Sequence, residues 1–184
     1  MEETILDAEE RMQKSVSTMV EEFAAIRSGR ASAALFDKIR IEYYGEPTPL
    51  NQVATVSVPE ARLVVIQPWD KSVIGAIEKA IQKSELSVNP SNDGKVIRIN
   101  IPPLTEDRRK EIVKMAKNTA EQARIAIRNI RRDANDQLKK AQKDGEITED
   151  DIKRGEDEVQ KLTDSFVEKV DAALAAKEKE ILEV

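Results

Sequence analysis

The distribution of proline divides this chain into three parts. All seven prolines lie between Pro47 and Pro103, and residues 1–46 and 104–184 contain none. Proline inside a helix removes a backbone hydrogen bond and clashes with the preceding turn, so long uninterrupted helices are expected where it is absent. The sequence therefore predicts helical arms at both ends of the chain and an irregular or strand-rich insert between them.

Apolar residues recur at steps of three and four in both arms, which is the period of an amphipathic helix. A first helix is predicted over about 4–28, with Gly29 as its stop. A second helix is predicted over about 105–143, some 38 residues and therefore roughly 57 Å long. A third begins near Thr148, after a short turn that contains Gly145. Helices joined by so short a turn pair antiparallel, so we expect the arms to form a three-helix bundle.

The insert shows a different pattern, with short runs of β-branched residues separated by turn residues. Strands are predicted near 39–43, 53–58, 63–66 and 95–101, and a helix near 72–83. We therefore expect a small α/β domain, rich in β-structure, of short strands with one helix. Trp69 is expected to pack inside this domain rather than to bind a partner.

These patterns together predict an α+β fold. A discontinuous three-helix bundle domain is expected from residues 1–30 and 105–184, with the small domain inserted at 31–104. Two stretches of chain would connect the domains, near 29–32 and 102–105, and a double connection permits a hinge while limiting twist. The predicted hinge residues are Gly29, Arg30, Ala31, Ser32, Pro102, Pro103, Leu104 and Thr105.

Composition excludes several classes of function. The chain has no cysteine and no histidine, so disulfides, the usual zinc sites and histidine acid–base chemistry are absent. No apolar run approaches 18 residues, and the acidic N-terminus does not resemble a secretory or transit signal. No pair of carboxylates suggests acid–base catalysis. We expect a monomeric cytoplasmic protein that is not an enzyme and has no catalytic residues, metal site, cofactor or membrane contact.

Positive charge is concentrated on one face of the second predicted helix, although the chain carries a net charge of −5. Residues 105–132 contain nine basic and four acidic side chains, which gives this segment a net charge of +5. At about 100° per residue, seven of the basic residues share an arc of roughly 100°, and we call this set the basic ridge. It consists of Lys110, Lys114, Lys117, Arg124, Arg128, Arg131 and Arg132. The opposite side, expected to face the core, includes Ile112, Met115, Thr119, Ala123 and Ile130.

The basic ridge has two interpretations. It is either a solvated helix face, partly paired with acids such as Glu121 or those of the third helix, or a surface for RNA. Arginine favours bidentate phosphate contacts, and the absence of aromatic residues on the ridge favours the backbone of structured RNA over single-stranded bases. Arg27 and Arg30 either stabilise the end of the first helix or extend the RNA surface. A coiled-coil adaptor for a protein partner is the alternative function.

Four segments of the chain resemble the ribosome recycling factor family, and the resemblance extends over the whole length. They are residues 26–32 (IRSGRAS), 43–52 (YYGEPTPLNQ), 101–110 (IPPLTEDRRK) and 128–135 (RNIRRDAN). The resemblance implies an L-shaped protein, similar in outline to transfer RNA, that binds the large ribosomal subunit and its 23S-type ribosomal RNA after termination. It also implies that elongation factor G, with GTP, acts with the protein to split the ribosome into subunits and release it from messenger RNA.

The same resemblance assigns roles to individual arginines. Arg131 matches the arginine that is critical for function in the family, and Arg128 and Arg132 lie beside it. Arg27 and Arg30 match other basic positions that face the ribosome. The implied mechanism is mechanical: a stiff helical arm held to RNA, and a small domain that swings on its hinge.

Overall fold

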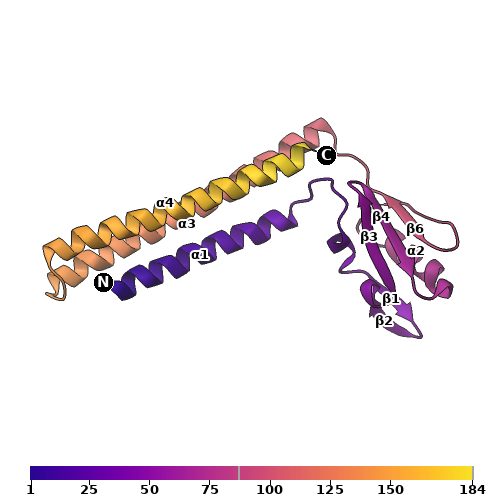
Figure 1. Cartoon of the computed structure of the whole chain (residues 1–184), viewed down its shortest axis with the longest axis horizontal. Helices are drawn as coiled ribbons and strands as arrows, with labels where there is room; N and C mark the ends of the chain where they lie inside the picture. The colour runs from indigo at the N-terminus through magenta and orange to yellow at the C-terminus, as the bar shows by residue number, and fades with distance from the viewer. Residues whose placement is uncertain (87, 184) are drawn as a thin grey trace. The chain divides into compact units, whose positions relative to one another are not determined.

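The structure, a computed structural model, describes residues 1–86 and 88–183. The chain divides into two compact units, one formed by Met1–Arg27 with Glu106–Glu183 and the other by Ser28–Thr105. We call them the helical unit and the small unit, and Figure 1 labels most of their helices and strands. The fold class is α+β, with long helices in one unit and short antiparallel strands in the other.

Three long helices make up the helical unit and lie side by side (Figure 1). They are α1 (Glu2–Ala25), α3 (Glu106–Lys143) and α4 (Glu149–Leu182). The bounds of α3 and α4 agree with the periodicity of the sequence. Helix α1 ends at Ala25, three residues earlier than predicted, because the backbone becomes extended at Ile26.

The turn between α3 and α4 is built from the residues that the sequence suggested. Gly145 has φ +77°, a conformation that favours glycine, and it allows the chain to reverse directly after α3. Thr148 caps α4: its hydroxyl accepts from the backbone N–H of Asp151 at 3.1 Å, and the Asp151 carboxylate accepts from the backbone N–H of Thr148 at 2.9 Å. These bonds, together with Arg154, lower the pKa of Asp151 to about 2.

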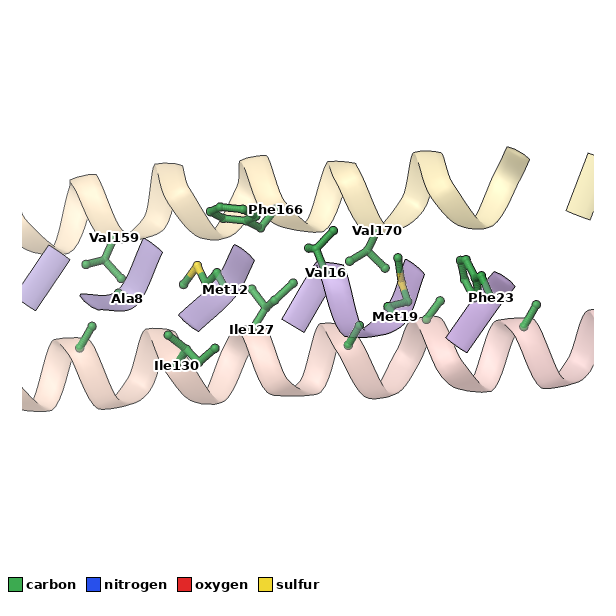
Figure 2. Packing of buried hydrophobic residues seen from close by; sticks show 14 of the residues in the cluster. Ala8, Met12, Val16, Met19, Phe23, Ile127, Ile130, Val159, Phe166 and Val170 are labelled. Carbon is green, nitrogen blue, oxygen red and sulfur yellow. The ribbon is translucent and has the colours of Figure 1, made fainter. Parts of the chain in front are cut away.

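The core of the helical unit lies between the three helices. Figure 2 shows Met12 of α1 near Ile127 of α3 and Phe166 of α4, and Met19 of α1 further along the core near Val170 of α4. Helix α3 contributes a narrow stripe in which half the buried side chains are alanine, which lets its neighbours approach closely. The buried residues of α3 are Ile112, Ala116, Ala120, Ala123, Ile127, Ile130, Ala134 and Leu138.

The prediction that Met115 faces this core was wrong, since its side chain is 48% exposed. The stripe spans only about 80° of the α3 helical wheel, and Met115 lies some 60° beyond its edge. Thr119, which was also placed toward the core, lies about 20° beyond the same edge and is only half-buried.

Short strands and one helix form the small unit. A four-stranded antiparallel sheet has the strand order β3-β4-β6-β5, and β1 pairs with β2 in a separate hairpin. The strands are β1 (Arg40–Tyr43), β2 (Glu46–Pro49), β3 (Ala54–Glu60), β4 (Leu63–Pro68), β5 (Pro90–Asn92) and β6 (Ile97–Asn100). The helix is α2 (Ile74–Gln82), and short 3-10 turns lie at Ala33–Phe36, Leu50–Gln52 and Lys71–Val73.

The core of the small unit is mainly aliphatic, with Phe36 buried among side chains from the sheet, the β1–β2 hairpin and α2. Alternate residues of β4 and β6 point into it, as expected for strands with one buried face. Val64, Ile66, Ile97 and Ile99 from the sheet are fully buried, as is Ile77 from α2.

Trp69 contributes little to this core, contrary to the sequence prediction. Its side chain is 67% exposed, and its indole N–H donates to the Thr55 hydroxyl at 3.1 Å. The indole N–H is therefore hydrogen-bonded to a residue of β3 while the ring stays exposed.

Candidate nucleic-acid interface

The basic ridge lies outside the buried stripe of α3. Five of its residues, Lys110, Lys114, Lys117, Arg128 and Arg132, are exposed, and Arg124 and Arg131 are half-buried. The buried stripe spans about 200° to 280° on a wheel that starts at Lys110, and the ridge spans about 300° to 40°. The two arcs adjoin along one edge, so the residues at that edge, Arg124 and Arg131, also reach α4.

Arg124 is held by acidic groups on two helices. Its Nε and Nη2 atoms donate to Asp171 Oδ1 of α4 at 2.9 and 2.6 Å, and its Nη1 donates to Glu121 Oε2 at 3.1 Å. The hydrogen bonds to Asp171, with those to Glu121, raise the pKa of Arg124 despite its partial burial. These contacts tie α3 to α4 and offset much of the charge that Arg124 would present to a polyanion.

Three further members of the ridge have weaker acidic partners. Arg128 lies 3.6 Å from Glu121, and both side chains are about half exposed. Lys110 lies 3.9 Å from Glu106, and Lys117 lies 3.9 Å from Glu178. Exposed pairs at such distances contribute little free energy and exchange easily for other partners. Their positive charge therefore remains available to a ligand.

Lys114, Arg131 and Arg132 differ from the rest of the ridge. Within the described part of the chain, no acidic side chain lies within ion-pairing distance of any of the three. Arg131 instead donates from Nη1 to the neutral Gln160 Oε1 of α4 at 3.3 Å. The sequence motif at 128–135 thus places two arginines, Arg131 and Arg132, on the surface of α3 with uncompensated charge.

Arg27 and Arg30, the other predicted basic contacts, fall in different units. Arg27 is exposed and lies two residues after the end of α1, at the end of the Met1–Arg27 segment of the helical unit. Arg30 belongs to the small unit and is also exposed. The structure therefore groups the seven ridge residues on one helix and leaves these two outside that group.

The arrangement suits electrostatic binding. Guanidinium groups spaced along one side of a long helix match a phosphate backbone, and the rigid helix fixes their spacing. Among residues 1–86 and 88–183 no cluster of acidic side chains could hold a metal ion, and no helix is long and apolar enough to cross a membrane.

Gln160 is the residue at this surface that the sequence did not suggest. It is a neutral residue in a strongly acidic helix, and its contact with Arg131 depends on how α4 is aligned against α3. That alignment cannot be read from the periodicity of either helix alone. The spacing of Gln160 and Asp164, four residues apart on one face, was the only local signal.

Comparisons with known proteins agree in assigning the chain to one family. A family model described as "Ribosome recycling factor" matches residues 19–182. The ribosome-recycling factor of Halalkalibacterium halodurans is 61% identical over 182 residues, which cover 99% of this chain and 98% of that protein.

Two solved structures are also similar over nearly the whole chain. A solution structure of the ribosome recycling factor is 43% identical with a TM-score of 0.75, covering 100% of this chain and 97% of that one. The second describes the T. thermophilus ribosome recycling factor and the E. coli elongation factor G bound to the E. coli post-termination complex. It is 49% identical with a TM-score of 0.63 and covers 98% of both chains.

Proposed function

The chain belongs to the ribosome recycling factor family, and we propose that its helical unit docks on structured RNA of the large ribosomal subunit through the basic ridge. The family consists of non-enzymatic factors, so the protein itself breaks no bond. It acts on post-termination ribosomes in the cytoplasm, as a monomer. Elongation factor G and GTP work with it to split the ribosome into subunits and release messenger RNA.

Arg131 and Arg132 carry the largest share of the RNA contact, with Arg128 beside them. The observation that carries this proposal is the uncompensated charge of Arg131 and Arg132 on the surface of α3, in contrast to Arg124, which Asp171 and Glu121 hold. Lys114 adds to the same surface. Lys110 and Lys117 contribute less, because an ammonium group cannot make the bidentate phosphate contact of a guanidinium. Arg124 contributes less because Asp171 and Glu121 hold it, and Arg27 and Arg30 contribute less because they lie off the ridge.

We propose that the helical unit stays rigid and that the small domain moves by rotation about the two connections between the units. Helix α3 has 38 residues and packs against both α1 and α4, which favours a stiff arm. We place the moving domains at residues 1–30 with 105–184 and at residues 31–104, which differ from the two compact units by at most three residues where the chain passes between them. The proposed hinge consists of Gly29–Ser32 and Pro102–Thr105. When the GTPase acts, the small domain turns on this hinge while the ridge holds the helical unit to RNA.

Sedimentation of post-termination ribosomes tests the proposal. Ribosomes incubated with the protein, elongation factor G and GTP should separate into subunits on a sucrose gradient. Arg132→Ala and Arg131→Ala should reduce splitting at limiting protein, because each removes one phosphate contact. Arg154→Ala removes the same residue type from α4 at a site away from the ridge and should split ribosomes as well as the unaltered protein. Equal splitting by all three variants would reject the ridge as the docking surface.

A further inference from the structure

Two hydrogen bonds link Arg131 to a pair of polar side chains on α4. The Arg131 guanidinium donates from Nη1 to Gln160 Oε1 at 3.3 Å. The Gln160 amide donates in turn from Nε2 to Asp164 Oδ1 at 2.9 Å. The chain of contacts runs from the Asp164 carboxylate through the Gln160 amide to Arg131, for which we proposed a contact with RNA.

The chemistry of these groups fixes the orientation of the amide. An ionised carboxylate only accepts hydrogen bonds, so the NH2 group of Gln160 must face Asp164. The carbonyl oxygen of Gln160 is then directed to Arg131, which only donates. Residues 160 and 164 lie one turn apart on α4, a spacing at which glutamine and aspartate side chains meet.

Arg124 offers an internal comparison on the same pair of helices. It lies two turns before Arg131 on α3 and also reaches α4, but its partner there is the carboxylate of Asp171. A carboxylate both orients a guanidinium and cancels its charge. An amide carbonyl orients the guanidinium and leaves the positive charge in place.

We propose that Gln160 is a positioning residue for Arg131: it holds the guanidinium at the edge between α3 and α4 while leaving its charge free for an RNA phosphate. Asp164 keeps the Gln160 carbonyl directed to Arg131. Holding a flexible side chain in its bound arrangement lowers the entropic cost of binding. This inference rests on the proposed function, in which Arg131 contacts RNA.

The test uses the full-length protein and purified large ribosomal subunits, with binding measured at several salt concentrations. Gln160→Glu replaces the carbonyl with a carboxylate of nearly the same shape. It should weaken binding about tenfold, because it cancels one charge that pairs with phosphate. The negative slope of log K against log salt, the salt slope, should become less steep by roughly 0.7–0.9. Gln160→Ala should weaken binding about threefold with little change of slope, because the charge survives and only its positioning is lost.

A matched control separates this effect from added negative charge in general. Gln13→Glu places the same charge on an exposed site of α1, where the native amide donates a hydrogen bond to the Ser17 hydroxyl at 3.3 Å. It should leave the binding constant and the salt slope unchanged. Wild-type binding by Gln160→Glu, or an equal loss in Gln13→Glu, would overturn the proposal. Thermal unfolding followed by circular dichroism checks that each variant is folded.

Combination with Arg131→Ala separates failure of this inference from failure of the proposed function. If Gln160 acts through Arg131, neither Gln160 variant should weaken binding further once Arg131 is alanine. An additional loss in that background would show that Gln160 acts independently. If Arg131→Ala itself leaves binding unchanged, the docking surface is wrong. If it weakens binding and the Gln160 variants do not, only the positioning role is rejected.

Discussion

Replacing Arg124 with alanine should destabilise the helical unit, whereas replacing Arg132 should not. Both are arginines on the same ridge, eight residues apart, so the two variants form a matched pair. The Arg124 side chain is only 19% exposed and donates three hydrogen bonds to Asp171 and Glu121. Arg132 is exposed, and the described residues offer it no acidic partner.

The size of the effect follows from burial and screening. Charge-assisted hydrogen bonds contribute about 1.5–3 kcal/mol when well shielded, and exposed pairs about 0–1 kcal/mol. Asp171 is 55% exposed and Glu121 is 48% exposed, so solvent screens the acids although the guanidinium is largely covered. We therefore expect Arg124→Ala to lower the free energy of unfolding by about 1–2 kcal/mol, part of it from the lost packing of the alkyl stem. Arg132→Ala should change it by less than about 0.5 kcal/mol.

Urea denaturation followed by circular dichroism at 222 nm measures both values, since the helical unit dominates that signal. A double-mutant cycle with Asp171→Ala should give a coupling free energy of about 0.5–1.5 kcal/mol. Ribosome binding should rank the variants in the opposite order, with the larger loss in Arg132→Ala. Equal stability of the two single variants, or a cycle with no coupling, would show that the contact between Arg124 and Asp171 does not tie α3 to α4.

Three further predictions concern the stability of the fold. The pKa of Asp151 is lowered to about 2, so its carboxylate stabilises the protein fully above about pH 4. This contribution disappears as the pH falls from about 4 toward 2. Asp151→Asn should flatten that part of the pH dependence of the melting temperature. Gly29→Ala should lower the free energy of unfolding, measured in urea, by about 1–3 kcal/mol, because φ is +82° and a Cβ would lie 2.8 Å from Leu104 Cγ. Gly45→Ala should lower it by less, because Gly45 has φ +81° but open space around it. Ile127→Ala should lower the unfolding free energy by about 2–5 kcal/mol, since this side chain is fully buried between the helices, and a loss below 1 kcal/mol would contradict the packing in Figure 2.

The sequence was sufficient to predict the helices because their signals are local. The absence of proline, the apolar period, the Thr148 cap and the Gly145 turn each act within a few residues, and the bounds of α3 and α4 follow from them. Strands β2 and β5 were missed because they contain Pro47, Pro49 and Pro90. Each is paired on one side only, which is where a sheet tolerates proline.

The surface was less predictable than the helix that carries it. Periodicity placed the seven basic residues on one arc, but the partners of Arg124 and Arg131 lie 47 and 29 residues further along the chain. Only the alignment of α4 against α3 decides that Asp171 meets the first and Gln160 the second. The interpretation as a paired helix face therefore holds for Arg124, which is an ion-paired structural residue. Arg132 keeps its charge available, and RNA binding there stays a prediction.

The exposed position of Trp69 also depends on a distant contact. Its partner, Thr55, lies 14 residues earlier, on the first strand of the sheet. Residue type alone predicts that a tryptophan side chain is mostly buried. Here the indole N–H has its hydrogen-bond partner at the surface, so the ring can stay exposed.

The most direct test of the docking surface is the salt dependence of binding to large ribosomal subunits. The slope of log K against log salt is negative, and it should become less steep by roughly 2–3 in a variant with Arg128, Arg131 and Arg132 all changed to alanine. Each lost phosphate contact reduces its magnitude by about 0.7–0.9. Between 50 and 200 mM salt, each lost contact changes the ratio of affinities about threefold. The same affinity and slope as the unaltered protein, in a variant with a native circular dichroism spectrum, would contradict the assignment of this face of α3 to RNA.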